Sequence, residues 1–190
     1  MIRALALCLV AGSAAAQPVL RPDDEARLAA YHETVGVALM EAFHGGTDAN
    51  IRTVVTALSG APEPLDPEGE WACRTIKLGK TLPIVAYSPF RCRITEVSPG
   101  VWTFEKLTGS QRTAGTIWDT GPVAYYAGVG YVNDDGPIPY GDFPPDETVT
   151  SSPQRTPDVA VFEQVSGDRA RLIFPAPHLE SRLDILELTR

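Results

Sequence analysis

The sequence predicts an α+β protein in which an N-terminal helical hairpin packs on an antiparallel, barrel-like β-sheet of about eight strands. The first observation is that the hydrophobic period changes from 3.6 to 2 residues near Trp71. The second is that the later apolar stretches are short and separated by turns of hairpin length, as in antiparallel barrels. The third is that no helical pattern lies between these stretches, whereas parallel strands would need such crossovers.

The first predicted helix begins after Pro22, because a proline followed by the acids Asp23 and Asp24 is typical of a helix start. Apolar residues then recur at helical spacing as far as Ala42, and Gly45-Gly46 ends the run. Charged residues on this helix are interpreted as a solvated face, and they include Glu25, Arg27 and Glu33.

A second, shorter helix is predicted to begin at Thr47 or Asp48 and to end at Gly60 and Pro62. Its apolar residues also recur at helical spacing, so the two helices are expected to form a hairpin. We therefore divide the chain into a signal segment (1–16), a helical hairpin (17–65) and an antiparallel β-barrel-like domain (66–190).

The barrel-like domain contains eight or nine candidate strands, and its prolines are expected to lie outside them, since proline cannot donate to a strand ladder. The candidates are Trp71–Leu78, Pro83–Tyr87, Phe90–Val97, Val101–Leu107, Gln111–Asp119, Val123–Val132, Val159–Val165, Ala170–Phe174 and Leu183–Leu188. The gap at 133–157 is rich in Gly, Pro, Asp and Ser. It is interpreted as a long, partly ordered surface loop.

Residues 1–16 have the three-part pattern of a secretory signal peptide. Arg3 precedes an apolar run, and small residues lead to a cleavage site near Ala16. We therefore expect a periplasmic or secreted protein. The run is too short to span a bilayer, and no long apolar segment occurs elsewhere, so no transmembrane span is predicted.

Cleavage would remove Cys8 and leave two cysteines, Cys73 and Cys92. In an exported chain this pair favours a disulfide bond, which a chain-entropy estimate values at about 3 kcal/mol. The formal net charge of −8 argues against nucleic acid as a partner. No cofactor or metal site is predicted, and Asn133-Asp134-Asp135-Gly136 is interpreted as a turn, since it lacks the alternating ligands and final glutamate of a calcium loop.

The candidate site is a set of polar residues on the strands. Arg74, Arg91 and Arg93 flank the two cysteines, and strand alternation directs them to the opposite face. Three guanidinium groups on one face need carboxylates or an anion among them. The remaining members of the set are Gln111 and Arg112 at a turn, and Glu180 and Asp184 as counter-charges. Two interpretations stay open: an ion-pair network that ties the last strand to the first, which we favour, or an anion-binding patch.

Four segments of the chain resemble a bacterial family known as domain of unknown function 4893. They are Trp71–Gly79, Tyr87–Ile94, Lys106–Arg112 and Pro175–Leu188. The resemblance implies an exported envelope protein of Gram-negative bacteria and supplies no established activity. Many members of the family are lipoproteins, but Cys8 lacks a suitable lipidation context here. The family motif includes Cys73, Arg74, Cys92, Arg93, Gln111, Arg112, Glu180 and Asp184.

The leading functional hypothesis is a non-catalytic module that binds a small ligand or an envelope protein, because a barrel-like pattern occurs without a catalytic constellation. One alternative is an envelope hydrolase that uses Glu180 or Asp184 with Arg112. Another is an inhibitor of a secreted protease, since Gly69-Glu70-Trp71 opens the first strand as a Gly-x-Trp does in lipocalins and small bacterial inhibitors. A purely structural envelope protein is the third alternative.

Overall fold

The computed structural model describes residues 18–132 and 135–190. Three helices come first: α1 (Pro22–Ala29), α2 (Tyr31–Gly45) and α3 (Asp48–Leu58). Ten strands and a 3-10 helix, η1 (Tyr140–Asp142), follow among the described residues. The strands are β1 (Gly69–Leu78), β2 (Ile84–Ala86), β3 (Phe90–Ser98), β4 (Val101–Lys106), β5 (Gln111–Asp119), β6 (Ala124–Val132), β7 (Thr150–Ser151), β8 (Gln154–Ser166), β9 (Arg169–Pro175) and β10 (Leu183–Thr189).

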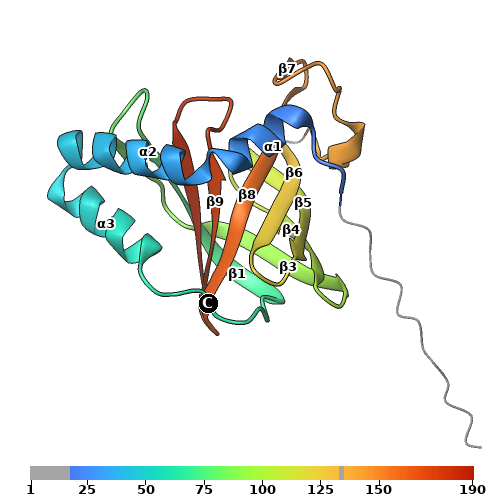
Figure 1. Ribbon diagram of the computed structural model, residues 1–190, viewed down its shortest axis with the longest axis horizontal. Coiled ribbons are helices and arrows are strands. Elements are labelled where there is room, and N and C mark those ends of the chain that lie inside the picture. Colours follow the sequence, from blue (N-terminus) through green and yellow to red (C-terminus); the bar gives the residue numbers. More distant parts are fainter. Residues whose placement is uncertain (1–17, 133–134) are drawn as a thin grey trace, which may run out of the picture.

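Eight of these strands form a closed antiparallel barrel, which confirms the predicted fold class. Their order is β1-β3-β4-β5-β6-β8-β9-β10, and β10 pairs with β1 over seven residues to close the circle. The short strands β2 and β7 pair with β1 and β8 outside this circle. Most neighbouring strands are joined by short turns, whereas β6 and β8 are joined by the long segment that contains η1 and β7, and the barrel is the architecture that the alternating apolar pattern indicated (Figure 1).

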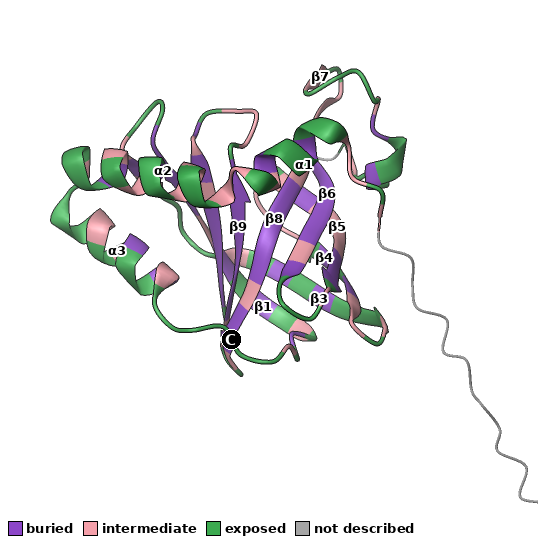
Figure 2. Ribbon diagram, viewed as in Figure 1, coloured by how far each residue is buried: buried purple, intermediate pink, exposed green. Residues whose placement is uncertain are grey.

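The inside and the outside of the barrel contribute to two different apolar cores. One half of the barrel interior is filled by large side chains such as Trp71, Phe104 and Phe162. On the outside, α2 lies against β1, β9 and β10, and α3 lies against β2; Ala42 and Val54 of these helices belong to the same apolar cluster as Ile185. Figure 2 shows the result as buried strands beneath helices whose outward faces are exposed. The polar residues inside the barrel lie at the other end, away from Trp71.

Cys73 and Cys92 form the predicted disulfide between β1 and β3, with a Cα–Cα distance of 5.9 Å. Both residues are fully buried in the barrel core. They are diagonal neighbours, because Cys92 pairs with Trp71 and Cys73 pairs with Phe90 in the ladder. The bond therefore joins two strands that are already adjacent and faces away from the flanking arginines, as strand alternation predicts.

The helical region differs from the sequence prediction in two respects. The first predicted helix is interrupted at Ala30, where a turn separates α1 from α2. Arg27 does not lie on a solvated face, as Glu25 and Glu33 do, but is buried with 8% of its surface exposed. The interpretation of Arg27 was wrong because helical spacing alone does not reveal that α1 lies against β8 (Figure 1).

The range 133–157 also contains more regular structure than predicted. β8 begins at Gln154 rather than at Val159, and β7 and η1 lie in the same range. Pro157 occupies a strand position, which the sequence analysis excluded for prolines. Its ladder partner on β6 is Val129, and β9 pairs with β8 only from Val161 onward. The missing amide hydrogen of Pro157 therefore removes no ladder bond to β9.

The structure does not bear on two features of the sequence. The predicted signal segment and the first half of the Asn133–Gly136 turn lie outside the described residues. Among the described helices, none is long and apolar enough to cross a membrane.

Candidate functional site

A cavity of about 120 Å³ opens at the polar end of the barrel. Charged and polar side chains from six strands and from the β9–β10 loop surround it, together with a few apolar ones. The residues that matter for its chemistry are Lys77, Lys106, Gln111, Arg112, Thr113, Arg155, Asp158, His178 and Asp184. The apolar core described above fills the other part of the barrel interior. The cavity is therefore limited to the polar end, which we call the mouth of the barrel.

Lys77 on β1 is an ion-paired cation at this mouth. Its Nζ donates hydrogen bonds to Oε1 of Gln111, at 2.9 Å, and to Glu180. Burial by itself would favour the neutral amine, but the hydrogen bond to Glu180 and the charge of Asp184 outweigh it and raise the pKa of Lys77. The same bond lowers the pKa of the Glu180 carboxyl. Lys77 and Glu180 therefore both stay charged near neutral pH.

Lys106, the last residue of β4, is buried without an acidic partner. Only 6% of its surface is exposed, and the described residues place no carboxylate within ion-pairing distance of its Nζ. The Nζ donates to Oγ1 of Thr75 at 3.2 Å and lies 4.4 Å from the centre of the Phe90 ring. Burial, reinforced by the charges of Lys77 and Arg112, lowers the pKa of Lys106 to about 8. Lysine is rarely buried without a partner, so this environment is unusual.

Two carboxylic acids face the lysines from other strands. Asp184 on β10 is the ladder partner of Lys77, and its Oδ1 accepts a hydrogen bond of 2.5 Å from Ser181 Oγ. Loss of hydration nevertheless raises the pKa of Asp184 to about 6. Asp158 on β8 accepts a hydrogen bond of 2.7 Å from Thr113 Oγ1, yet burial raises its pKa as well. Asp184 can therefore bind a proton at mildly acidic pH.

Two glycines on β6, Gly128 and Gly130, leave space for neighbouring polar side chains. A Cβ atom added to Gly130 would lie 2.7 Å from Oδ2 of Asp158, and one added to Gly128 would overlap the Tyr126 hydroxyl. Tyr126 is 0% exposed, and its hydroxyl lies 2.7 Å from Thr113 Oγ1. Because Thr113 donates to Asp158, the tyrosine must donate to Thr113. The Gly-x-Gly pair of β6 thus serves close packing inside the barrel.

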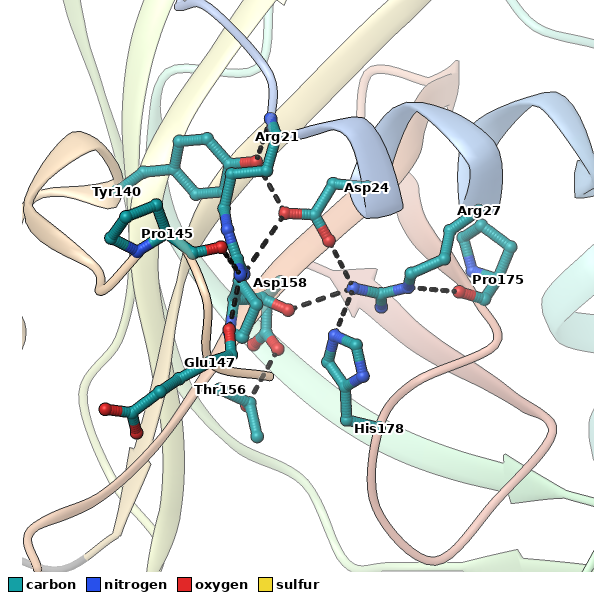
Figure 3. Close-up of polar contacts among 11 residues, drawn as sticks. Arg21, Asp24, Arg27, Tyr140, Pro145, Glu147, Thr156, Asp158, Pro175 and His178 are labelled. Carbon is teal, nitrogen blue, oxygen red and sulfur yellow. Dashed lines mark hydrogen bonds and ion pairs between the residues drawn. The ribbon is translucent and has the colours of Figure 1, made fainter. Parts of the chain in front are cut away.

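Arg27 on α1 attaches this helix to the rim of the mouth (Figure 3). It donates to Asp24 Oδ1 at 2.8 Å and to the carbonyl oxygens of Pro157 and Pro175 at 3.0 and 3.2 Å. Its Nη1 also lies 3.2 Å from Nε2 of His178, a residue that lines the cavity. An arginine can only donate, so Nε2 of His178 is the acceptor. Loss of hydration, with the charge of Arg27, lowers the pKa of His178 to about 4 and keeps the ring neutral.

Asp24 links Arg27 to the segment that contains η1. Its carboxylate is 0% exposed and accepts a hydrogen bond of 2.6 Å from the Tyr140 hydroxyl. The amide of Arg21 in turn donates to the same hydroxyl at 3.1 Å. Loss of hydration and the neighbouring Asp24 charge raise the pKa of Tyr140. Asp24 is shared by Arg21 and Arg27, and these contacts join α1 to the segment of η1, so we assign the cluster a structural role beside the cavity (Figure 3).

The three arginines that flank the cysteines lie on the outside of the barrel and do not reach the cavity. Arg74 forms an ion pair of 2.5 Å with Glu187 on β10, and so connects the first barrel strand to the last. Arg93 pairs with Glu70 at 2.5 Å, and Arg91 lies 3.7 Å from the same carboxylate.

The arginines share one face, as the sequence analysis expected, but the expected counter-charges were wrong. Strand register decides the partners: Arg74 is opposite Glu187, and Arg93 is opposite Glu70. The expected partners, Glu180 and Asp184, lie at the barrel mouth instead.

The other four predicted site residues do come together at the mouth. Gln111, Arg112 and Asp184 line the cavity, and Glu180 contacts Lys77 and Gln111 beside it. Arg112 donates from Nε to the carbonyl oxygen of Gly109 at 2.8 Å. The predicted polar set is thus two sites: an ion-paired outer face and a polar cavity.

Sequence reasoning missed the two lysines and His178. A signal for the lysines was present, since alternation along β1 places Lys77 on the same inward face as Trp71 and Cys73. On β4, Lys106 likewise lies on the same face as the buried Phe104 and Trp102, because residues two positions apart in a strand point to the same side. No pattern in the sequence places His178, because it lies in a loop and gains its role only by contact with Arg27.

A family model described as domain of unknown function (DUF4893) matches residues 17–188. No curated protein matches the chain. No solved structure matches it either.

Proposed function

We propose that this chain, which belongs to the family of the domain of unknown function DUF4893, is a non-catalytic binding module that holds a small anion in the mouth of its barrel. The observation that carries the proposal is the excess of cationic side chains around the cavity. Four of them, Lys77, Lys106, Arg112 and Arg155, face only two carboxylic acids in the lining. Glu180 pairs with Lys77 beside the cavity, and Lys106 is the lining cation to which the described residues offer no ion-pairing carboxylate.

Two further features favour an anion over a neutral ligand. The pKa of both lining acids is raised, and since that of Asp184 is about 6, mildly acidic pH would neutralise this carboxylate and increase the positive charge of the cavity. Among the residues that the structure describes, none offers Lys106 an ion-pairing carboxylate, and an anion beside it would stabilise its charged form by Coulomb attraction. The ligand would therefore supply a counter-charge at this position.

The size of the cavity limits the ligand to a small molecule. A volume of about 120 Å³ corresponds to roughly four water molecules at ~30 Å³ each. Pockets for drug-sized ligands have volumes of about 300 Å³ or more. The anion would therefore be small, such as an inorganic oxyanion or a short carboxylic acid.

The proposal includes the bacterial envelope as the location of this module. Its support is the predicted signal at residues 1–16 together with the Cys73–Cys92 bond, because disulfides persist mainly in oxidising compartments. Cell fractionation tests the location directly. Recovery of the protein with both thiols free in the cytoplasmic fraction would contradict it.

Thermal unfolding with a ligand panel tests anion binding. Acetate, lactate and phosphate should each be compared with glycerol at constant ionic strength. At a concentration of about 100 Kd, a bound anion should add about 2.7 kcal/mol to the free energy of unfolding. Lys77→Met should weaken the effect, whereas Arg91→Met, on the outer face, should leave it unchanged. Equal shifts with all anions and with glycerol would refute the proposal.

The hydrolase alternative gains one specific observation. Asp184 and Arg112 line the same cavity, and a pKa of about 6 suits Asp184 to exchange protons near neutral pH. Turnover of chromogenic esters or phosphoesters that disappears in Asp184→Asn would replace the binding proposal by this one. The described residues provide no observation that favours a protease inhibitor, and that alternative stays a prediction.

A further inference from the structure

Lys106 has an environment that suits a nucleophile as well as a cation. We infer that its amine forms an imine with the carbonyl group of a small 2-oxo acid held in the barrel mouth. The inference rests on the proposed anion binding, because the carboxylate of such an acid is what the cationic lining would hold. It goes further by naming the ligand class and a covalent bond.

The three lysines of the chain have three different environments. Lys77 is held by Glu180 and Gln111. Lys80 is exposed to solvent. Lys106 is 6% exposed and lines the cavity, and it has one hydrogen-bond acceptor, the hydroxyl of Thr75, at 3.2 Å. Among the described residues, Lys106 is thus the buried, cavity-lining lysine whose Nζ has no carboxylate within ion-pairing distance.

The same environment favours the neutral form of the Lys106 amine, which is the form that attacks a carbonyl group to make an imine. Burial and the charges of Lys77 and Arg112 lower the pKa of Lys106 to about 8. Roughly a quarter of the amine would then be neutral at pH 7.5, compared with about one part in a thousand for an ordinary lysine. Desolvation beside a second cation is a recognised way to activate a lysine nucleophile.

A 2-oxo acid fits the arrangement of charges. Its carboxylate would pair with the cations of the mouth, Lys77 and Arg112, both of which lie close enough to Lys106 to act on its pKa. The carbonyl carbon is bonded directly to the carboxylate carbon, so it would lie beside Lys106. Pyruvate is a short carboxylic acid of the kind that the small cavity favours.

The covalent step balances with groups that the cavity holds. The neutral Lys106 nitrogen attacks the carbonyl carbon and forms the C–N bond, while the carbonyl oxygen takes a proton from protonated Asp184. The nitrogen returns a proton to the Asp184 carboxylate. Asp184 then protonates the hydroxyl group, and the C–O bond breaks to release water. The products are a protonated imine, an ionised Asp184 and one water molecule, so no oxidant or reductant is required.

Reductive trapping tests the inference on the wild-type protein. Pyruvate and borohydride are added near pH 7.5, and peptide mass mapping locates the carboxyethyl adduct on each lysine. We expect at least about tenfold more adduct on Lys106 than on the exposed Lys80, because Lys106 has the larger neutral fraction. Lactate, which matches pyruvate in size but has no carbonyl group, should compete. Lys106→Met should abolish the selective adduct, and Lys80→Arg should preserve it.

The outcomes separate this inference from the binding proposal. If lactate stabilises the protein but pyruvate leaves Lys106 unmodified, or modifies Lys80 as strongly, the imine is refuted and anion binding stands. If neither lactate nor pyruvate binds and no adduct forms, both are refuted. Mapping uses the unmodified chain, so the result does not depend on whether Lys106→Met folds.

Discussion

Replacing Lys106 with methionine is expected to stabilise the protein near neutral pH. The pKa of Lys106 is lowered from 10.5 to about 8, because burial disfavours its charge. At about 1.4 kcal/mol for each pH unit, keeping the ammonium in the fold below pH 8 costs about 3 kcal/mol. Methionine has a similar length and no charge. It would lose the hydrogen bond to Thr75, which is worth about 1 kcal/mol. The expected net gain is about 2 kcal/mol.

The sign of this effect should depend on pH. Between pH 8 and 10.5 the unfolded lysine holds a proton that the folded lysine has lost, so the wild type gains stability as the pH rises. The methionine variant lacks this gain of about 3 kcal/mol. Its advantage of about 2 kcal/mol at pH 6 should therefore become a deficit of about 1 kcal/mol near pH 10.5.

Urea unfolding followed by tryptophan fluorescence measures this difference. Trp71, Trp102 and Trp118 are all at least nine-tenths buried and should report the transition. Lys80→Met, at an exposed lysine, is the matched control and should change the free energy of unfolding by less than about 0.5 kcal/mol at either pH. A Lys106→Met variant that is destabilised by the same amount at both pH values would refute the reasoning.

Three further predictions concern stability. Replacing Cys73 and Cys92 with alanine should lower the free energy of unfolding by about 3 kcal/mol, and intact-mass measurement with and without reductant checks the bond itself. Because the pKa of Asp184 is raised to about 6, its proton contributes up to about 3 kcal/mol to the free energy of unfolding below pH 4, and this contribution is lost as the pH rises through 6. In Asp184→Asn, the free energy of unfolding should no longer fall with pH over this range. Arg27→Met should cost about 3 to 5 kcal/mol in urea unfolding, because it leaves the buried carboxylate of Asp24 without its closest cation.

Each of these predictions has an outcome that would contradict it. Two free thiols in the exported protein would exclude the disulfide. An unchanged slope between pH 4 and 6 in Asp184→Asn would show that this residue is not the origin of the pH dependence. Arg52, exposed on α3, is the control for Arg27. Equal losses for Arg52→Met and Arg27→Met would mean that the buried ion pair contributes nothing specific.

Much of the fold could be predicted because its elements are encoded locally. Alternating apolar residues predict the strands, and turn residues mark where they end, so the strands of the first two-thirds of the barrel agree with prediction to within a few residues. The start of β8 at Gln154 was not predicted, because prolines near it are typical of a loop. Pro153 and Pro157 indicate a loop, whereas the neighbours of the strand determine that Pro157 is tolerated there.

The candidate site was predicted only in part, because its chemistry depends on contacts between distant residues. Gln111, Arg112, Glu180 and Asp184, four members of the predicted set, lie together at the mouth, but Glu180 contacts Lys77 rather than the arginines beside the cysteines. Lys77 and Asp184 are opposite each other only because β10 pairs with β1, which joins residues more than one hundred positions apart.

The sequence by itself determined the α+β class, the strand pattern, the two cysteines available for a bond and the membership of a family. These properties follow from residue spacing and composition, which act over a few neighbours. Only the tertiary structure decided that Arg27 is buried, that Arg74 pairs with Glu187, and that Lys106 is buried beside a cavity where no carboxylate of the described residues forms an ion pair with it. The physical reason is that strand register and barrel closure set which side chains meet and how much water reaches them, and both charge pairing and pKa depend on that environment.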